Sequence, residues 1–134
     1  MSYVDGFVIA VPTANKQKFI EHARLGDGVF MDLGALRVVE CWGDDVPEGQ
    51  YTDFRKAVQA KEDETVVFSW IEWPDKQTRE VAYTKMNEWM KHPEKSDPRM
   101  NPETNPMPFE GKRLILGGFA PLVELAEQLR SKES

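Results

Sequence analysis

Two glutamates interrupt apolar segments of the sequence and are the first candidates for chemistry. Glu40 lies in LRVVECW and Glu72 in TVVFSWIEW, and both segments are rich in β-branched and aromatic residues. A carboxylate in apolar surroundings either gains a basic partner or changes its ionisation, and such groups serve as general bases. Glu40 and Glu72 are therefore candidate catalytic bases. The more common situation is a structural ion pair, here with Arg37, Arg79 or Arg113.

Cys41, the single cysteine, is a third catalytic candidate. Catalysis by a thiol needs a neighbouring activator such as histidine. The chain has only His22 and His92, and the sequence places neither of them near Cys41. A buried, inert thiol is the favoured interpretation.

Motifs for a metal or a cofactor are weak in this sequence. Asp44 and Asp45 follow Glu40 closely and could offer carboxylate oxygens to a hard cation, but a solvated turn is the more common role of such a pair. Gly117 and Gly118 lack the lysine and hydroxyl residue of a phosphate-binding loop. We expect no metal and no cofactor.

Aromatic residues suggest a pocket for a small organic ligand. Such pockets are mostly apolar with a few polar anchors. The ligand-binding candidates are Trp42, Trp70 and Phe68, with Arg37 as a polar contact. The same aromatic residues would equally suit a core or a subunit interface.

The elements that must position these residues follow from apolar spacing and from breaks at proline and glycine. Strands are predicted at 3–12, 36–42, 65–73 and 112–119. Helices are predicted from Thr13 or Asn15 to Gly34, at 76–91 with Asp75 as cap, and within 52–61. A last helix is predicted from Pro121, with four residues inward: Leu122, Leu125, Ala126 and Leu129. This order indicates an α+β, ferredoxin-like βαββαβ domain over 1–134, with a C-terminal helix and a four-stranded antiparallel sheet.

Glycine and proline mark two unusual places in this plan. Gly26 and Gly28 each cost a helix about 1 kcal/mol relative to alanine. Gly26 falls on the apolar face, where close approach to the sheet would explain it, whereas Gly28 predicts a kink or frayed turn. The connection 93–110 holds five of the nine prolines, which excludes regular structure and predicts a stiff arm or a functional flap.

Both faces of the predicted sheet are apolar. The first strand places Val4 and Val8 on one side and Phe7 and Ile9 on the other, and the third strand alternates in the same way. Two helices can cover only one face, so the other needs a second layer. A homodimer that buries sheet against sheet meets this need.

Composition limits the classes of partner. The 134 residues carry a net charge of -6, which disfavours nucleic acid. No apolar run approaches the roughly 20 residues that cross a bilayer, so no membrane partner is expected. With one cysteine and no basic leader before the first apolar run, we expect a cytoplasmic protein.

Four ordered motifs resemble a known family. VDGFVIAVP, ALRVVECWGDDVP, ETVVFSWIEWP and GKRLILGGF are similar to the bacterial YbaA-like proteins. The chain departs from that pattern at Gly26-Asp27-Gly28 and in the proline-rich connection. The resemblance implies the dimeric α/β-barrel superfamily, and it implies no function.

Three functions therefore remain open. The first is a homodimer that binds a small molecule without converting it. The second is a cofactor-independent enzyme, resembling an oxygenase or isomerase, that uses a strand carboxylate. The third is a module for a protein or RNA partner, with the proline-rich connection as the contact and RNA disfavoured by the acidic charge.

Overall fold

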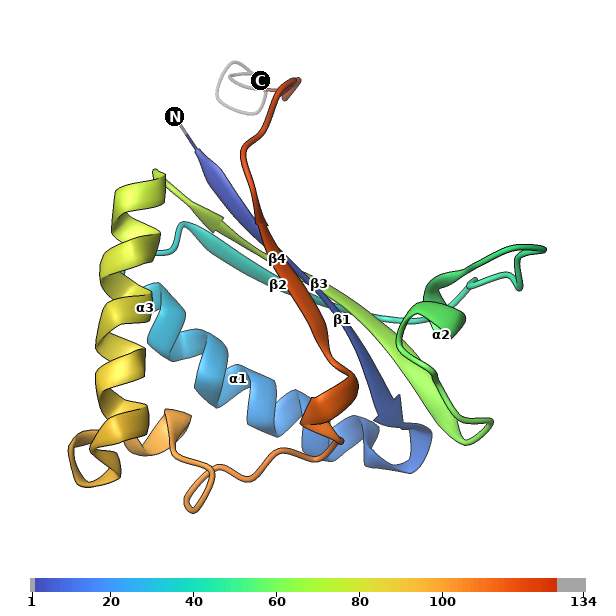
Figure 1. Cartoon of the computed structure of the whole chain (residues 1–134), viewed down its shortest axis with the longest axis horizontal. Coiled ribbons are helices and arrows are strands. Elements are labelled where there is room, and N and C mark those ends of the chain that lie inside the picture. The colour runs from blue at the N-terminus through green and yellow to red at the C-terminus, as the bar shows by residue number, and fades with distance from the viewer. Residues whose placement is uncertain (1, 128–134) are drawn as a thin grey trace, which may run out of the picture.

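A four-stranded antiparallel sheet forms the centre of the protein. The structure is a computed structural model that describes residues 2–127. The sheet order is β2-β3-β1-β4, so β1 and β3 are central and β2 and β4 are edges (Figure 1). The strands are β1 (Tyr3–Pro12), β2 (Arg37–Trp42), β3 (Glu64–Trp73) and β4 (Ile115–Phe119). The first three lie within one residue of their predicted bounds.

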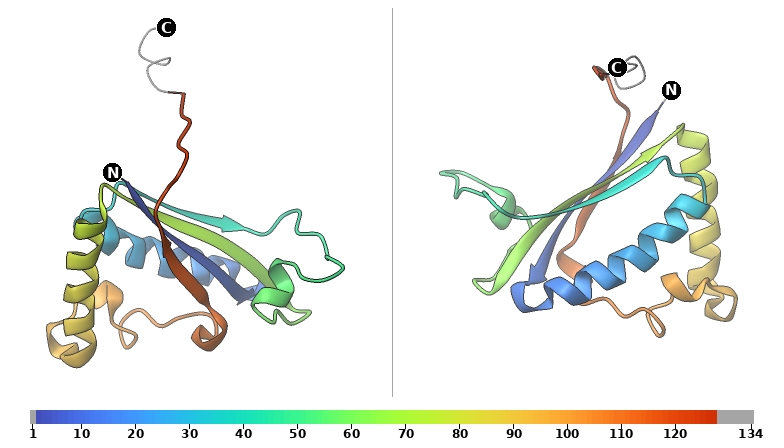
Figure 2. Two further views of the ribbon diagram at one scale, coloured as in Figure 1. Left: turned by 45° about the horizontal axis from the view of Figure 1, so that its top comes forward. Right: turned by 180° about the vertical axis from the view of Figure 1, so that it is seen from behind.

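The two long helices, α1 (Lys16–Asp32) and α3 (Lys76–Lys91), lie on the same side of the sheet (Figures 1 and 2). The short helix α2 (Phe54–Ala57) lies near one end of the strands and packs on the opposite face, where Val58 contacts the Ala10 and Val66 cluster. The mixed α+β architecture predicted from the sequence is therefore confirmed. Within residues 2–127, no helix has the length and apolar character needed to span a membrane.

The ends of these helices follow their capping residues. Asp75 caps α3, because its side chain accepts a hydrogen bond from the Thr78 N–H at 2.7 Å. Asn15 precedes α1, but its amide instead donates to the Pro108 carbonyl at 2.9 Å. After α1, Gly34 adopts a φ of 111°, which favours glycine and turns the chain toward β2.

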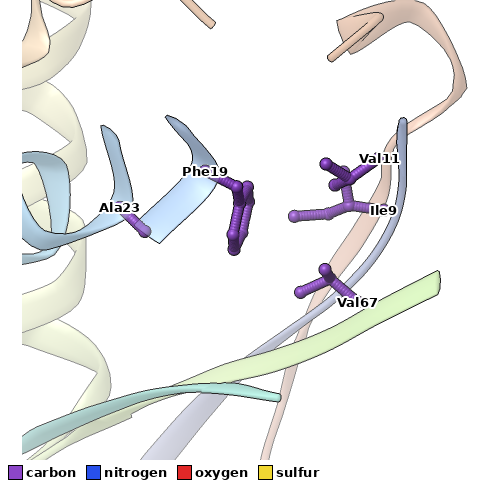
Figure 3. Close-up of a cluster of buried hydrophobic side chains, with 5 residues drawn as sticks. All are labelled: Ile9, Val11, Phe19, Ala23 and Val67. Carbon is purple, nitrogen blue, oxygen red and sulfur yellow. The ribbon is translucent and has the colours of Figure 1, made fainter. Parts of the chain in front are cut away.

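The core lies between the helices and one face of the sheet. Figure 3 shows Phe19 and Ala23 of α1 directed toward Ile9, Val11 and Val67 of the strands. A second cluster joins α3 to the sheet through Ile71, Trp73, Ala82 and Met86. Each large apolar side chain buried in this way contributes about 1.5–3 kcal/mol.

Asp5 is a charged residue inside this core, with 1% of its surface exposed. Its carboxylate accepts hydrogen bonds from Trp73 Nε1 at 2.8 Å, from Arg79 Nε at 2.9 Å and from the Tyr83 hydroxyl at 2.9 Å. Arg79 also forms the ion pair and lies over the ring of Tyr83. Burial and the Asp5 charge raise the pKa of Tyr83. One carboxylate thus connects β1, β3 and α3.

The C-terminal part differs from its prediction. Residues 121–127 form no helix and run away from the body of the protein, with Leu122 97% and Leu125 92% exposed (Figure 1). Ala126 is also exposed, and Leu129 lies outside the described residues. The helix face that was predicted to point inward is not formed, because no other part of residues 2–127 packs against Leu122 or Leu125.

The fourth strand begins at Ile115, three residues later than predicted. Gly111–Arg113 instead forms a short 3-10 helix, and Arg113 donates to both carboxylate oxygens of the buried Glu64, at 2.7 and 2.6 Å. This bidentate pair holds the pKa of Glu64 down at about 2. The ion pair therefore fixes where the proline-rich connection rejoins the sheet.

The proline-rich connection is folded against α1. It contains the short 3-10 helices Pro93–Lys95 and Pro98–Met100, so the prediction that its prolines exclude regular structure was wrong. A Cβ on Gly26 would lie 3.7 Å from Met100 Sδ, and one on Gly28 would lie 3.2 Å from Arg99 Nη1. Gly26 thus faces the connection and not the sheet. The frayed turn expected at Gly28 is absent, because α1 continues through it to Asp32.

Replacement of Asp5 tests the buried network. Asp5→Asn is expected to lower the free energy of unfolding by about 3 kcal/mol, because it leaves Arg79 without its counter-charge. Urea denaturation measures this change. The matched control is Asp45→Asn in an exposed turn, which should change stability by less than about 0.5 kcal/mol. Equal stability of the two variants would contradict the structural role of Asp5.

Candidate functional site

A cavity of about 240 Å³ lies between α1, the helix-covered face of the sheet and the proline-rich connection. We call it the inner cavity. Its walls are mainly apolar, with aromatic side chains from the sheet, α1 and the connection: Phe7, Phe19, Phe30 and Phe109. Five polar residues also line it: His22, Asp27, Glu40, Ser69 and Arg99. This combination is typical of a site for a small organic molecule.

Glu40 is the carboxylate that β2 brings to this cavity. Val38, Glu40 and Trp42 alternate toward the helices, and Glu40 pairs across the sheet with Ser69. Glu40 Oε1 is buried and has no hydrogen-bond partner among residues 2–127. A buried acceptor in this condition is unfavourable by about 1–3 kcal/mol unless something donates to it.

Asp27 of α1 lies against Glu40. Desolvation, the hydrogen bond to Glu40 and the negative charge of Glu40 together raise the pKa of Asp27 to about 9. At neutral pH the two carboxyl groups therefore hold one proton between them. The pair can accept a donor from a ligand, and it can also give or take a proton.

A second cavity of about 290 Å³ lies on the other side of this carboxyl pair, between α1 and β2. We call it the outer cavity. It is lined by Lys16, Arg24 and Trp42, and it shares Asp27 and Glu40 with the inner cavity. Lys16 Nζ lies 5.5 Å from the centre of the Trp42 ring. The carboxyl pair thus lies in the wall between an apolar cavity and a more basic one.

His22 has a fixed orientation at the edge of the inner cavity. Asn105 donates its amide to the carbonyls of His22 and Arg99, at 3.2 and 2.7 Å. The amide oxygen of Asn105 therefore faces His22 Nδ1 at 3.0 Å, and Nδ1 is the donor. In the neutral ring, Nε2 is then a hydrogen-bond acceptor.

Arg99 fastens the proline-rich connection to α1. Its Nε and Nη2 donate to Asp97 at 3.0 and 2.8 Å, and Nη2 donates to Asp32 of α1 at 2.8 Å. These hydrogen bonds raise the pKa of Arg99 and lower that of Asp97. The guanidinium charge is therefore balanced by these two aspartates and not by the Asp27–Glu40 pair.

The predicted site residues divide between the two faces of the sheet. Glu40 and Trp42 face the helices and the cavities. Phe68 lies on the opposite face, which we call the open face, and Trp70 contributes to both the open face and the inner cavity. The structure therefore does not bring Glu40 and Glu72 together, because Glu72 falls on the same side as Phe68 and Trp70.

Glu72 forms a structural ion pair, which was the alternative to its role as a catalytic base. It accepts a hydrogen bond from Trp70 Nε1 at 2.8 Å and lies 3.6 Å from Arg37 Nη1. The other suggested partners are engaged elsewhere, Arg79 with Asp5 and Arg113 with Glu64. Arg37 thus joins an ion pair on the open face, away from the inner cavity.

Cys41 is exposed, so the expected buried thiol is wrong. Cys41 lies on the edge strand β2, where it pairs with Phe68 and therefore faces the open side of the sheet. His22 lies on α1, on the opposite side, so it cannot activate this thiol. Asp44 and Asp45 are exposed in the following turn. Among residues 2–127, no three side chains of His, Cys, Asp or Glu are grouped to hold a metal ion.

Sequence reasoning missed Asp27. The signal was present, because Asp27 lies four residues after Ala23 and eight after Phe19, on the helix face that packs against the sheet. The predictions for this segment concerned only the glycines on either side of Asp27. What the sequence did not contain was the pairing of this position with Glu40, which depends on how α1 crosses β2.

Replacement of Asp27 tests the shared proton. The pKa of Asp27 is about 9 in the folded protein and 3.8 in the unfolded chain. Between these two values only the folded state binds the proton, so the free energy of unfolding falls as pH rises. Asp27→Asn keeps the donor to Glu40 without this titration. It should be more stable than the natural chain by more than about 1 kcal/mol at about pH 8.

Urea denaturation at about pH 5 and about pH 8 measures this gain, which should be larger at the higher pH. Glu21→Gln, on the exposed side of the same helix, is the control and should show no such trend. A stability difference for Asp27→Asn that is independent of pH would contradict the shared proton.

Comparison with known proteins places the chain in a family. Residues 2–111 match the family described as "Protein of unknown function (DUF1428)". The chain is 51% identical over 124 residues to "Uncharacterized protein YbaA" of Escherichia coli (strain K12), covering 92% of this chain and 99% of that protein. The same values hold for "Uncharacterized protein YbaA" of Shigella flexneri. Asp27, Glu40 and nearly all of the inner-cavity lining fall within the matched residues, and the chain belongs to this family of unknown function.

Proposed function

We propose that this protein is a homodimer that binds a small organic molecule in the inner cavity. The observation that carries this proposal is the buried Glu40 Oε1, which lacks a donor in a mainly apolar cavity. A ligand that donates to this oxygen would remove an unfavourable feature of the empty site. The bound molecule would be small, because about 240 Å³ lies below the roughly 300–1,000 Å³ of pockets for drug-sized ligands.

Acid–base catalysis by the same carboxyl pair is the second candidate function. The observation that favours it is the raised pKa of Asp27 beside Glu40. Two carboxyl groups that share a proton can act as acid and base on one bound molecule. Binding alone is the simpler function, because it uses the cavity and the unpartnered oxygen without requiring a reaction.

The open face of the sheet supports the homodimer. The sheet order β2-β3-β1-β4, with α1 and α3 on one side, supports the proposal of a ferredoxin-like domain that pairs as a dimeric α/β barrel. The open face carries apolar side chains from three strands, among them Phe68, 44% exposed, and Phe119, 61% exposed. α2 and Val58 cover the end of this face near Ala10 and Val66, and the Phe54 ring of α2 lies 5.8 Å from that of Phe68, so the rest of the face stays uncovered.

A second copy of the chain is the occupant that we propose for the open face. Antiparallel sheets with one face in water commonly carry polar side chains on that face, whereas this face is largely apolar. The exposed segment 121–127 extends beyond the sheet from β4, where a second copy could receive Leu122 and Leu125. Two identical apolar faces related by twofold symmetry would cover each other.

Blocking the inner cavity tests ligand binding. Fragments that bind only the native state raise its stability, by about 2.7 kcal/mol at 100 times the dissociation constant. Ser69→Leu places a larger side chain in the cavity wall and should abolish the thermal shift that such fragments cause. Gln77→Leu, on the exposed part of α3, is the control and should keep it.

Two results would contradict ligand binding in the cavity: no fragment stabilises the natural chain, or the fragments stabilise Ser69→Leu equally. The fragments that bind also separate the two functions. A binding protein releases them unchanged, whereas a catalyst converts them.

A charge on the open face tests the homodimer. Phe68→Glu places a carboxylate in the proposed interface and should convert the dimer to a monomer, because an unpaired charge buried there is strongly unfavourable. Analytical ultracentrifugation measures the mass. Val81→Glu, at an exposed apolar position of α3, should leave the dimer intact. A natural chain that sediments as a monomer would end the proposal.

A further inference from the structure

Three of the polar residues that line the inner cavity are His22, Asp27 and Glu40, and their free atoms are hydrogen-bond acceptors. Glu40 Oε1 is an acceptor without a donor. His22 commits Nδ1 to Asn105, which leaves Nε2 as an acceptor. The proton of the Asp27–Glu40 pair is used within the pair. A ligand that binds Glu40 and His22 must therefore bring donors.

The carboxyl pair also has no ion-pair partner among the described residues, although Lys16, Arg24 and Arg99 line the cavities on its two sides. None of the ion pairs among residues 2–127 involves Glu40 or Asp27, and Arg99 directs its donors to Asp97 and Asp32. A buried carboxylate is stable when a cation lies beside it. A neutral donor would satisfy the oxygen but not the charge, so a cationic ligand fits better.

The aromatic walls suit the same kind of ligand. Phe19, Phe30 and Phe109 line the cavity together with the sulfur-containing Met100 and Met107. Aromatic faces attract cations, and polarisable sulfur contacts aromatic rings favourably. A molecule with an apolar body and one ammonium group would match both the walls and the carboxyl pair.

We propose that the inner cavity binds a small primary amine as its ammonium ion, with the nitrogen donating to Glu40 Oε1 and the apolar body against the aromatic walls. This inference rests on the proposed function, because it names the ligand class of the same cavity. The ammonium replaces the proton that Asp27 and Glu40 share. Both carboxylates are then ionised, and one proton leaves to solvent for each amine bound.

The proton exchange makes binding dependent on pH. The charged and titratable groups that face the pair are His22, Lys16 and Arg24 from α1 and Arg99 from the connection. β3 contributes Ser69, which is neutral, and β2 contributes Glu40 itself. Because a proton competes with the ammonium, affinity should increase as pH rises below the pKa of Asp27, about 9.

Three probes of similar shape and different charge test the ligand class: benzylamine, benzyl alcohol and benzoate. Isothermal titration calorimetry with the natural chain should give the tightest binding for benzylamine, weaker binding for benzyl alcohol and none for benzoate. Glu40→Gln should weaken benzylamine by at least about tenfold and leave benzyl alcohol within about threefold. Glu72→Gln, on the open face, is the control and should change neither.

A second variant keeps the test decisive if Glu40→Gln does not fold. Asp27→Asn retains the Glu40 charge and removes the titrating proton. It should still bind benzylamine, and its affinity should no longer rise with pH. Titrations in buffers of different ionisation enthalpy should show proton release for the natural chain and none for this variant.

The outcomes separate the inference from the proposed function. If benzyl alcohol binds as tightly as benzylamine and Ser69→Leu abolishes both, the amine inference is overturned and the cavity still binds small molecules. The same holds if other fragments bind in the cavity and benzylamine does not. If neither the probes nor any fragment binds, both proposals are overturned.

Discussion

The carboxylate of Asp5 is the constraint on which the arrangement of the elements depends. It lies on β1, in the middle of the sheet, and binds donors from β3 and from two successive turns of α3. Charge inside a core is unfavourable unless every acceptor is used, so the network permits one position of α3 on the sheet. Apolar contacts such as those of Ala82 and Met86 add stability, but they would tolerate small shifts. With α3 placed in this way, the space beside it is left for α1 and the connection.

The proline-rich connection, and not another helix, lies against α1 and forms one wall of the inner cavity. Gly26 and Gly28 leave room for Met100 and Arg99 along α1. Asn105 and Arg99 then fasten the connection by hydrogen bonds to His22 and Asp32. The gap that remains lies next to Asp27 and Glu40, where the polar groups of the site are found.

The two faces of the sheet carry different kinds of feature. The helix-covered face has the cavities and the carboxyl pair, and the open face has exposed aromatic side chains with the Glu72–Arg37 ion pair. Glu40 and Glu72 both interrupt apolar strands, yet strand alternation sends them to opposite sides. Burial without a basic partner distinguishes Glu40, and its partners explain Glu72. The placement of Trp42 beside Glu40 and of Phe68 beside the open face follows from the same alternation.

The sequence by itself determined the strands β1, β2 and β3, the helices α1 and α3, and the alternation that separates Val4 and Val8 from Phe7 and Ile9, because these features depend on local spacing and caps. It also indicated Glu40 as an unusual carboxylate. The tertiary structure alone decided that Asp27 meets Glu40, that Arg79 and Arg113 pair with Asp5 and Glu64, and that residues 121–127 form no helix. Each of these depends on contacts between residues distant along the chain, or on their absence. A short segment with helical apolar spacing, such as that of Leu122 and Leu125, forms a stable helix when its apolar side chains pack against another part of the structure.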